Sequence, residues 1–181
     1  QAVAHLLSRR IDDRVPAAYL TREAWLGEFR FYVDERVIIP RSFIAELLPD
    51  GLAPWIPDPS AIGTALDLCT GSGCLAILLA HAYPEADVDA VDLSSDALAV
   101  AQRNVADYGL AGRINLIRSD LYANLVEKSY DLVISNPPYV TDRSMDALPA
   151  EYRHEPAMAL AGGDDGMDLV RKIIQEAPKH L

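Results

Sequence analysis

From residue 64 onward, the apolar positions of the chain fall into two alternating patterns. Short, nearly continuous apolar runs bounded by turn residues predict buried strands at Thr64–Leu68, Asp87–Val91, Ile114–Ile117 and Tyr130–Ile134. Apolar residues at helical spacing predict helices at Cys74–Ala82, from Ser94-Ser95 to Tyr108, and at Met167–Ala177. Strands that alternate with helices are typical of βαβ units, so we expect an α/β fold with parallel strands and flanking helices.

The first sixty residues show a different pattern. The expected elements are the end of a helix at Ala2–Ile11, a loop at Arg14–Thr21, a β-hairpin formed by Phe29–Val33 and Arg36–Ile39, a short helix at Phe43–Leu48 capped by Ser42, and a proline-rich connector at Pro49–Ser60. We therefore divide the chain into residues 1–60, which include a β-hairpin linker, and residues 61–181, which form the α/β domain.

Composition and charge narrow the function classes. With 181 residues, half of them apolar, the chain is long enough for one α/β domain with a sizeable core. Its formal net charge of −11 argues against a protein that coats DNA or RNA, so we expect no direct nucleic-acid binding. We see no signal peptide, and the longest apolar run, about ten residues near Cys74–Ala82, is too short to span a bilayer. A cytoplasmic location without a membrane partner follows by default.

The two cysteines, Cys69 and Cys74, flank a turn that contains glycine. Two cysteines are too few for a secreted disulfide framework, and no second pair of ligands accompanies them. We interpret them as small residues in a tight turn and predict no metal site.

The turn after the first strand of the α/β domain, Leu66–Gly73, reads LDLCTGSG. Glycines between a strand and its helix let a ligand approach the backbone closely. Asp92 lies 21 residues beyond Gly71, at the carboxyl end of the second strand, where an acid can accept hydrogen bonds from both hydroxyls of a ribose. These features predict a nucleoside-bearing ligand, but they do not distinguish nicotinamide from sulfonium cofactors.

Two further segments follow the third and fourth strands. Asp120 could receive the amino group of an adenine whose ring Leu121 covers, although an ordinary turn aspartate explains the pair equally well by itself. Ser135–Val140 reads SNPPYV, in which the prolines fix φ and leave carbonyls free. The side-chain oxygen of Asn136 and the carbonyl of Pro137 can both accept from one –NH₂ group, while Tyr139 offers a flat face. Two acceptors aimed at one nitrogen orient its lone pair toward an electrophile, which suits methyl transfer to an amide or an exocyclic amine.

Together, Asp67–Gly73, Asp92, Asp120 and Asn136–Tyr139 resemble the motifs of class I S-adenosylmethionine-dependent methyltransferases that modify planar nitrogens in DNA, RNA or protein. Pro16–Thr21 and Val37–Ser42 are similar to the segment before the catalytic domain in one such family, the protein-(glutamine N(5)) methyltransferases. Glu155-Pro156, Ala159-Leu160 and Gly162–Gly166 are similar to that family's loop after the Asn-Pro-Pro-Tyr motif, so the resemblance extends over nearly the whole chain.

That family has two main bacterial branches, one modifying peptide chain release factors and the other large-subunit ribosomal protein L three. Where the release-factor branch usually has Pro-Arg-Pro-Glu-Thr-Glu, this chain has Pro40–Ala45, PRSFIA. Asp67–Cys74 and Glu151–Pro156 resemble the ribosomal branch, although Phe43 departs from the proline expected there. The resemblance implies a protein substrate as partner: the ribosomal protein, with release factors as the alternative.

The resemblance also implies roles for single residues, with S-adenosyl-L-methionine as the cofactor. Cys69–Gly73 would border its methionine moiety, Asp92 would hold the ribose, and Asn136 would touch both cofactor and substrate. The implied cofactor-binding residues are Asp67, Cys69, Thr70, Gly71, Ser72, Gly73, Asp92, Leu93, Asp120, Leu121 and Asn136. The implied substrate-binding residues are Asn136, Pro137, Pro138 and Tyr139, of which Asn136, Pro137 and Tyr139 would be catalytic.

The implied fold is a Rossmann-like sheet, and the family has more protein on both sides of it: a helical N-terminal domain that helps to bind the substrate, and three further strands. The chain opens on Gln1 and stops at Leu181 directly after a helical pattern, so we expect both ends to be cut and the C-terminal strands to be missing. Residues 1–60 would then include the end of the substrate-binding region. Two other functions stay open: a nucleic-acid amine methyltransferase with the same core, and a non-catalytic binding module.

Overall fold

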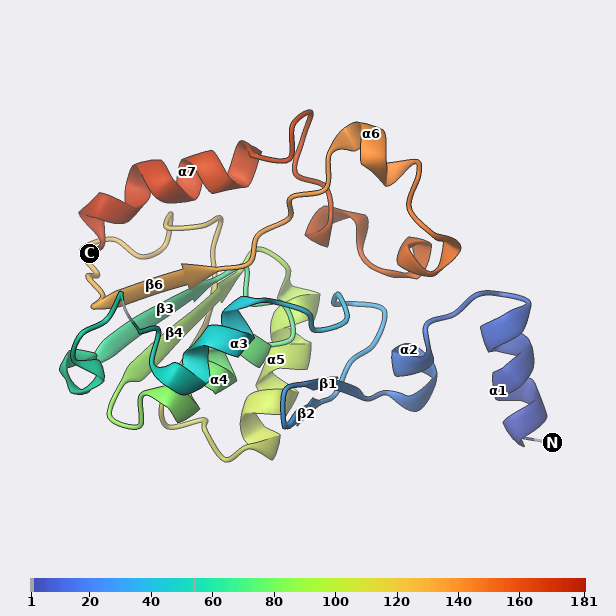
Figure 1. The fold of residues 1–181 in the computed structure, drawn as a ribbon, viewed down its shortest axis with the longest axis horizontal. Coiled ribbons are helices and arrows are strands. Elements are labelled where there is room, and N and C mark those ends of the chain that lie inside the picture. Colours follow the sequence, from blue (N-terminus) through green and yellow to red (C-terminus); the bar gives the residue numbers. More distant parts are fainter. Residues whose placement is uncertain (1, 54) are drawn as a thin grey trace.

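The structure is a computed structural model that describes residues 2–53 and 55–181. The expectations drawn from Gln1 and from Pro54 in the connector lie outside the described residues. An α/β body forms one end of the molecule, and α1 (Ala2–Ile11) lies at the opposite end (Figure 1). No helix among the described residues is long and apolar enough to cross a membrane.

A four-stranded parallel sheet forms the centre of the body. Its strands are β3 (Thr64–Leu68), β4 (Asp87–Asp92), β5 (Ile114–Arg118) and β6 (Leu132–Ser135), in the order β5-β4-β3-β6. The order reverses at β3, which pairs with β4 on one side and with β6 on the other. Open α/β sheets bind ligands outside the carboxyl ends of their strands at such a reversal. The predicted Rossmann-like parallel sheet is therefore confirmed, with β6 at one of its edges.

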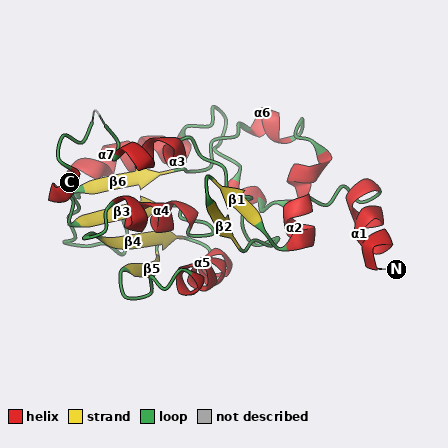
Figure 2. Cartoon of the chain, turned by 60° about the horizontal axis from the view of Figure 1, so that its bottom comes forward, coloured by secondary structure: helices red, strands yellow, loops and turns green. Residues whose placement is uncertain are grey.

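The two faces of the sheet are covered by different helices. On one face lie α3 (Ile44–Leu47), α4 (Cys74–Ala82) and α5 (Ser95–Asp107), and on the other lies α7 (Asp168–Glu176). Figure 2 shows α4 over β3 and β4. Successive residues of β3 serve opposite faces: Ala65 joins the cluster around α4, whereas Leu66 and Leu68 pack in the cluster that contains Ile173 of α7. Burial on both faces explains why most positions of this strand are apolar.

Two expectations for the N-terminal region are wrong. Part of the expected loop is a short helix, α2 (Ala17–Thr21), because Tyr19 is buried and donates a hydrogen bond to the Val37 carbonyl at 2.5 Å. The hairpin consists of β1 (Ala24–Leu26) and β2 (Phe29–Phe31), so it turns at Gly27, whose φ of +59° suits a two-residue hairpin turn.

The segment expected to form the hairpin turn, Asp34-Glu35, instead lies in the linker, where Asp34 binds Arg36. The Asp34 carboxylate accepts hydrogen bonds from the backbone and side chain of Arg36, and these bonds lower its pKa to about 2. Val33 and Val37 are buried against Val100 of α5, so the linker packs directly on the α/β body. The division at residue 60 stays a prediction.

The remaining differences are small shifts. Three of the four strands, β4, β5 and β6, end one residue later than expected, at Asp92, Arg118 and Ser135, and β6 begins at Leu132. The connector contains 3₁₀ turns at Leu48–Asp50 and Pro59–Ala61, and the expected C-terminal helix continues as a 3₁₀ turn at Ala177–Lys179. The segment after Tyr139 contains α6 (Asp142–Met145) and two more 3₁₀ turns, Ala150–His154 and Ala157–Ala159.

Candidate active site

A cavity of about 320 Å³ lies beyond the carboxyl ends of β3, β4 and β6. It brings residues from all four sequence motifs together. The predicted residues in its wall are Cys69, Gly71, Asp92, Leu93, Asp120, Leu121, Asn136 and Pro138. The others, Asp67, Thr70, Ser72, Gly73, Pro137 and Tyr139, are next to the wall in sequence but do not line it. Their predicted ligand contacts stay predictions.

Asp92 connects the glycine turn to the start of α5. Its Oδ2 atom accepts the Gly71 N–H and its Oδ1 atom accepts the Ser94 N–H, both at 2.9 Å. Burial raises the pKa of Asp92 above the ordinary aspartate value, although these backbone hydrogen bonds act in the opposite direction. Ser94, not Asp92, caps the helix, because the Ser94 hydroxyl accepts the Ala97 N–H.

Asp67 lies beneath the glycine turn and is completely buried. Thr70 Oγ1 donates to its Oδ2 atom at 2.6 Å, and the Oδ1 atom has no hydrogen-bond partner. Burial raises the pKa of Asp67 to about 7. Asp67 thus supports the glycine turn from below. Ionisation of its carboxyl group at alkaline pH lowers the stability of the folded protein, because the charge is buried.

Two residues of the cavity wall have a strained backbone. Cys69 and Leu121 have φ values of +62° and +47°, which side chains rarely adopt, and both line the cavity. A Cβ atom at Gly71 would meet nothing within 4 Å, so the space in front of that backbone is open. Burial raises the pKa values of the Cys69 and Cys74 thiols to about 12, so neither sulfur is a ready nucleophile at neutral pH.

Asn136 directly follows β6 and contacts the linker. Its Nδ2 atom donates to the main-chain carbonyl of Arg41 at 3.2 Å. The preceding residue, Ser135, donates through its hydroxyl to the Leu68 carbonyl, which joins the ends of β6 and β3. The described residues donate no hydrogen bond to the Asn136 Oδ1 atom or to the Pro137 carbonyl, so both acceptors are available to a ligand.

The glycine-rich loop after the motif packs on the backbone of Pro138 and Tyr139. Val140 donates to the Leu160 carbonyl and accepts from the Gly162 N–H, each at 2.8 Å. A Cβ atom at Gly162 would lie 2.7 Å from Tyr139 Cα and 2.9 Å from the Pro138 carbonyl oxygen. Tyr139 itself is 58% exposed, so its ring is accessible at the rim.

Several residues of the site were not predicted from the sequence. Glu35–Ile38 of the linker and Pro156, Met158, Ala159 and Leu169 also line the cavity. Asn104 of α5 donates to the carbonyls of Tyr32 and Ser72, which ties the linker to the glycine turn. One signal was present: Asn104 is an amide next to Val105 on the apolar face of its helix.

A larger hollow of about 730 Å³ lies at the other edge of the sheet, beside β5. It contains none of the motif residues, and two of its four charged members, Asp89 and Lys128, already form an ion pair at 2.6 Å. Within the described part of the chain, no three His, Cys, Asp or Glu side chains are grouped so that they could hold a metal ion. The chemistry-bearing residues thus gather at the smaller cavity.

Comparison with known proteins shows the family to which the chain belongs. The profile of the methyltransferase small domain family matches residues 51–153, more than half of the chain. The chain is 63% identical, over 99% of its length, to proteins from Bordetella pertussis and Burkholderia pseudomallei named ribosomal protein uL3 glutamine methyltransferase. A protein of the same name from Neisseria gonorrhoeae is 59% identical. The chain spans 60–61% of the length of these curated relatives.

Solved structures share the fold at low sequence identity. The hMettl16 catalytic domain in complex with MAT2A 3′UTR hairpin 6 has a TM-score of 0.61 at 14% identity, with 98% of this chain and 62% of that chain covered. The N-terminal domain of human METTL16 in complex with SAH has a TM-score of 0.55 at 17% identity, with 98% and 61% covered. At such identities the likeness concerns the fold alone.

Proposed function

Since this chain belongs to the methyltransferase small domain family, we propose that its protein transfers a methyl group from S-adenosyl-L-methionine to the side-chain amide nitrogen of a glutamine. The target we propose is large-subunit ribosomal protein L three, after the name shared by the relatives at 59–63% identity. The observation that carries the proposal is Asn136, whose amide nitrogen is held by the linker while its oxygen stays available beside the cavity.

The wall of the cavity fits an adenosine-bearing cofactor. Each Asp92 oxygen accepts one backbone hydrogen bond, which leaves further acceptor capacity for ribose hydroxyls. Leu93 and Leu121 supply apolar surface for a purine, and Asp120 lies beside them as an acceptor for its amino group. A cavity of about 320 Å³ is within the range of small-ligand sites. When bound, the cofactor supplies a methyl group on an electrophilic sulfonium.

The Asn136–Tyr139 segment would hold the glutamine amide. Asn136 Oδ1 and the Pro137 carbonyl accept its two N–H groups, and the Tyr139 ring covers its planar face. An amide nitrogen is a poor nucleophile, so alignment is the main contribution of these residues. The two acceptors also stabilise the positive charge that develops on the N–H groups as the new bond forms, and the proton leaves afterwards without a dedicated base.

The charge of the chain supports a protein substrate over a nucleic acid. A net charge of −11 repels phosphate and attracts a basic protein. Methylation of a ribosomal protein would take place in the cytoplasm. Release factors are the second candidate substrates, because the other main bacterial branch of the glutamine methyltransferases modifies them.

The test is methyl transfer by the full-length protein. We expect labelled methyl groups from the cofactor to appear in large-subunit ribosomal particles, in the protein fraction and on glutamine by mass spectrometry, and not in release factors or ribosomal RNA. Asn136→Ala should lower turnover by about 100-fold or more, since it removes one preorganised acceptor, while cofactor affinity changes far less. Label in the RNA, or near-normal turnover of Asn136→Ala, would refute the proposal.

A further inference from the structure

The side-chain amide of Asn136 has two ends with opposite hydrogen-bonding character, and its neighbour decides which end is free. The amide oxygen can only accept, whereas the –NH₂ group can only donate. The Arg41 carbonyl, 3.2 Å from Asn136 Nδ2, can only accept. A flipped Asn136 would bring two acceptors together, so this carbonyl holds the nitrogen and leaves Oδ1 as the available end.

The Arg41 carbonyl is itself held in place by Glu155. Arg41 donates through Nη1 to Glu155 Oε1 at 3.0 Å and through Nη2 to Oε2 at 2.9 Å. The Ile39 N–H donates to Oε2 at 3.3 Å. One carboxylate therefore binds both the side chain of Arg41 and the backbone two residues before it, in the paired geometry that makes such contacts specific.

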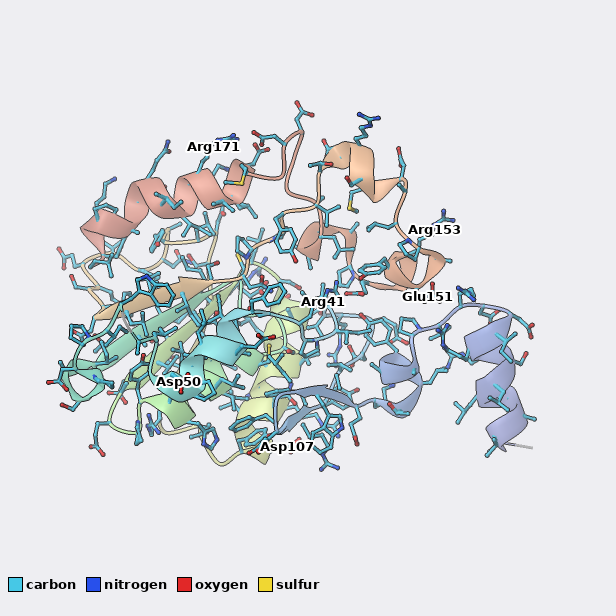
Figure 3. All side chains as sticks on the ribbon, in the orientation of Figure 1. Arg41, Asp50, Asp107, Glu151, Arg153 and Arg171 are labelled. Carbon is cyan, nitrogen blue, oxygen red and sulfur yellow. The ribbon has the colours of Figure 1, made fainter. Side chains whose placement is uncertain are left out.

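This ion pair is buried at the junction of two segments. The Glu155 side chain is 3% exposed and that of Arg41 35%, and the Arg41 guanidinium lies 5.0 Å from the centre of the Tyr152 ring. Burial by itself would lower the pKa of Arg41, but the hydrogen bonds to Glu155 and the charge of Glu155 raise it by more, so the guanidinium stays charged. Figure 3 shows Arg41 between the α/β body and the loop that carries Glu151 and Arg153.

We propose that Arg41 and Glu155 are positioning residues that set the orientation of the Asn136 amide, a role that rests on the proposed function for its effect on turnover. Glu155 fixes the backbone at Ile39–Arg41, the Arg41 carbonyl fixes the Asn136 nitrogen, and Oδ1 is thereby presented to the substrate amide. Neither charged side chain needs to touch the substrate. The loop after the motif and the linker before the α/β domain thus complete the site together.

The test uses the full-length protein and reads Asn136 directly. Glu155→Gln keeps the size of the side chain but removes its charge and presents an –NH₂ group to the guanidinium. We expect the Asn136 side-chain amide protons, followed by nitrogen-15 NMR, to exchange about 10-fold faster, because their acceptor is no longer fixed. Turnover should fall by roughly 10- to 100-fold, while the dissociation constant of S-adenosylhomocysteine changes by less than about 2-fold.

Glu151→Gln is the matched control. Glu151 lies in the same loop and also pairs with arginines, Arg10 at 3.1 Å and Arg14 at 2.9 Å, but these belong to the N-terminal region and not to the Asn136 contact. In Glu151→Gln, the exchange rate of the Asn136 side-chain amide and the dissociation constant of S-adenosylhomocysteine should match the wild type. Arg41→Lys is the second variant: it keeps the charge and the backbone carbonyl but loses the paired contact, so its exchange rate and turnover should lie between the wild type and Glu155→Gln.

Three outcomes would overturn the proposal. Unchanged Asn136 exchange in a folded Glu155→Gln or Arg41→Lys variant would show that the ion pair does not orient the amide. Equal losses of cofactor affinity and turnover would show a general structural role. A raised KM with unchanged kcat in Arg41→Lys would show that Arg41 contacts the substrate itself. The exchange readout needs no substrate, so it remains decisive even if the wild type transfers no methyl group and the proposed function fails.

Discussion

The two halves of the cavity are built in different ways. In the half with the glycine turn, Asp92 contacts Gly71, 21 positions earlier, and Ser94, two positions later. In the half with Asn136, the partner is Arg41, 95 positions away, and Glu155 of the downstream loop binds Arg41 in turn. The first half is a product of two adjacent βα turns. The second requires three distant segments to meet, so we expect it to respond to substitutions that lie far from it in sequence.

The largest effect on the site should come from adding one carbon to the distant loop. In Gly162→Ala, the new Cβ would lie 2.7 Å from Tyr139 Cα, so the Asn136–Tyr139 segment must shift. A displacement of about 1 Å costs roughly 100-fold in turnover, and we expect a loss of that size with cofactor affinity little changed. Turnover and S-adenosylhomocysteine binding, measured on the same preparation, check this.

Gly112→Ala is the control for that substitution. A Cβ atom at Gly112 meets nothing within 4 Å, and neither glycine has a positive φ. It should therefore retain wild-type turnover. If Gly162→Ala also did so, the dependence of the Asn136 half on the glycine-rich loop would be disproved.

The second largest effect is expected in the half of the cavity with the glycine turn. Asp92→Ala removes the acceptor proposed for two ribose hydroxyls and releases the Gly71 N–H. A charged hydrogen bond contributes about 1.5–3 kcal/mol, so cofactor affinity should fall by roughly 10- to 100-fold. Calorimetric titration measures it, and Asp87→Ala at the far end of the same strand serves as the control. An unchanged dissociation constant would contradict the ribose role.

The smallest effect on the site should come from Asp67→Asn, which changes stability more than binding. The pKa of Asp67 is raised to about 7, above the aspartate value of about 3.9 in an unfolded chain. The native state therefore binds the proton more tightly, and its stability falls as pH rises from about 4 to 7. The amide introduced by this substitution cannot ionise, so we expect the variant to be more stable than the wild type above pH 7. Thermal unfolding from pH 4 to 9 should show this advantage shrink as pH falls; a constant difference would argue against a protonated Asp67.

Much of the fold followed from the sequence because its signals are local. A buried parallel strand is apolar at most positions, and β3 was predicted with its observed bounds, Thr64–Leu68. Gly71 and Asp92 could likewise be placed at one sheet edge, since the topology of βαβ units brings adjacent strand ends together.

The sequence was less informative where distant contacts decide the structure. The hairpin was placed too late because the alternation around Asp34 looked like two strands, whereas Asp34 is held by Arg36 and the turn occurs at Gly27. Glu155 was noted as part of a family-like loop, but its contact with Arg41 spans 114 positions and leaves no local pattern. The sequence also could not show that one oxygen of Asp67 has no hydrogen-bond partner, because the family resemblance implied a cofactor contact for this residue.

The ion pair between Arg41 and Glu155 also has a consequence for biosynthesis. A nascent chain folds as it leaves the ribosome, beginning from its N-terminal end. The linker, the glycine turn and Asp92 are all synthesised before Asn136, but Glu155 follows Asn136 by 19 residues. The half of the cavity with the glycine turn can therefore form while the chain is still being translated, whereas the acceptor proposed for the substrate amide is set only after the downstream loop has emerged. Translation itself would delay the onset of activity until this part of the chain is complete.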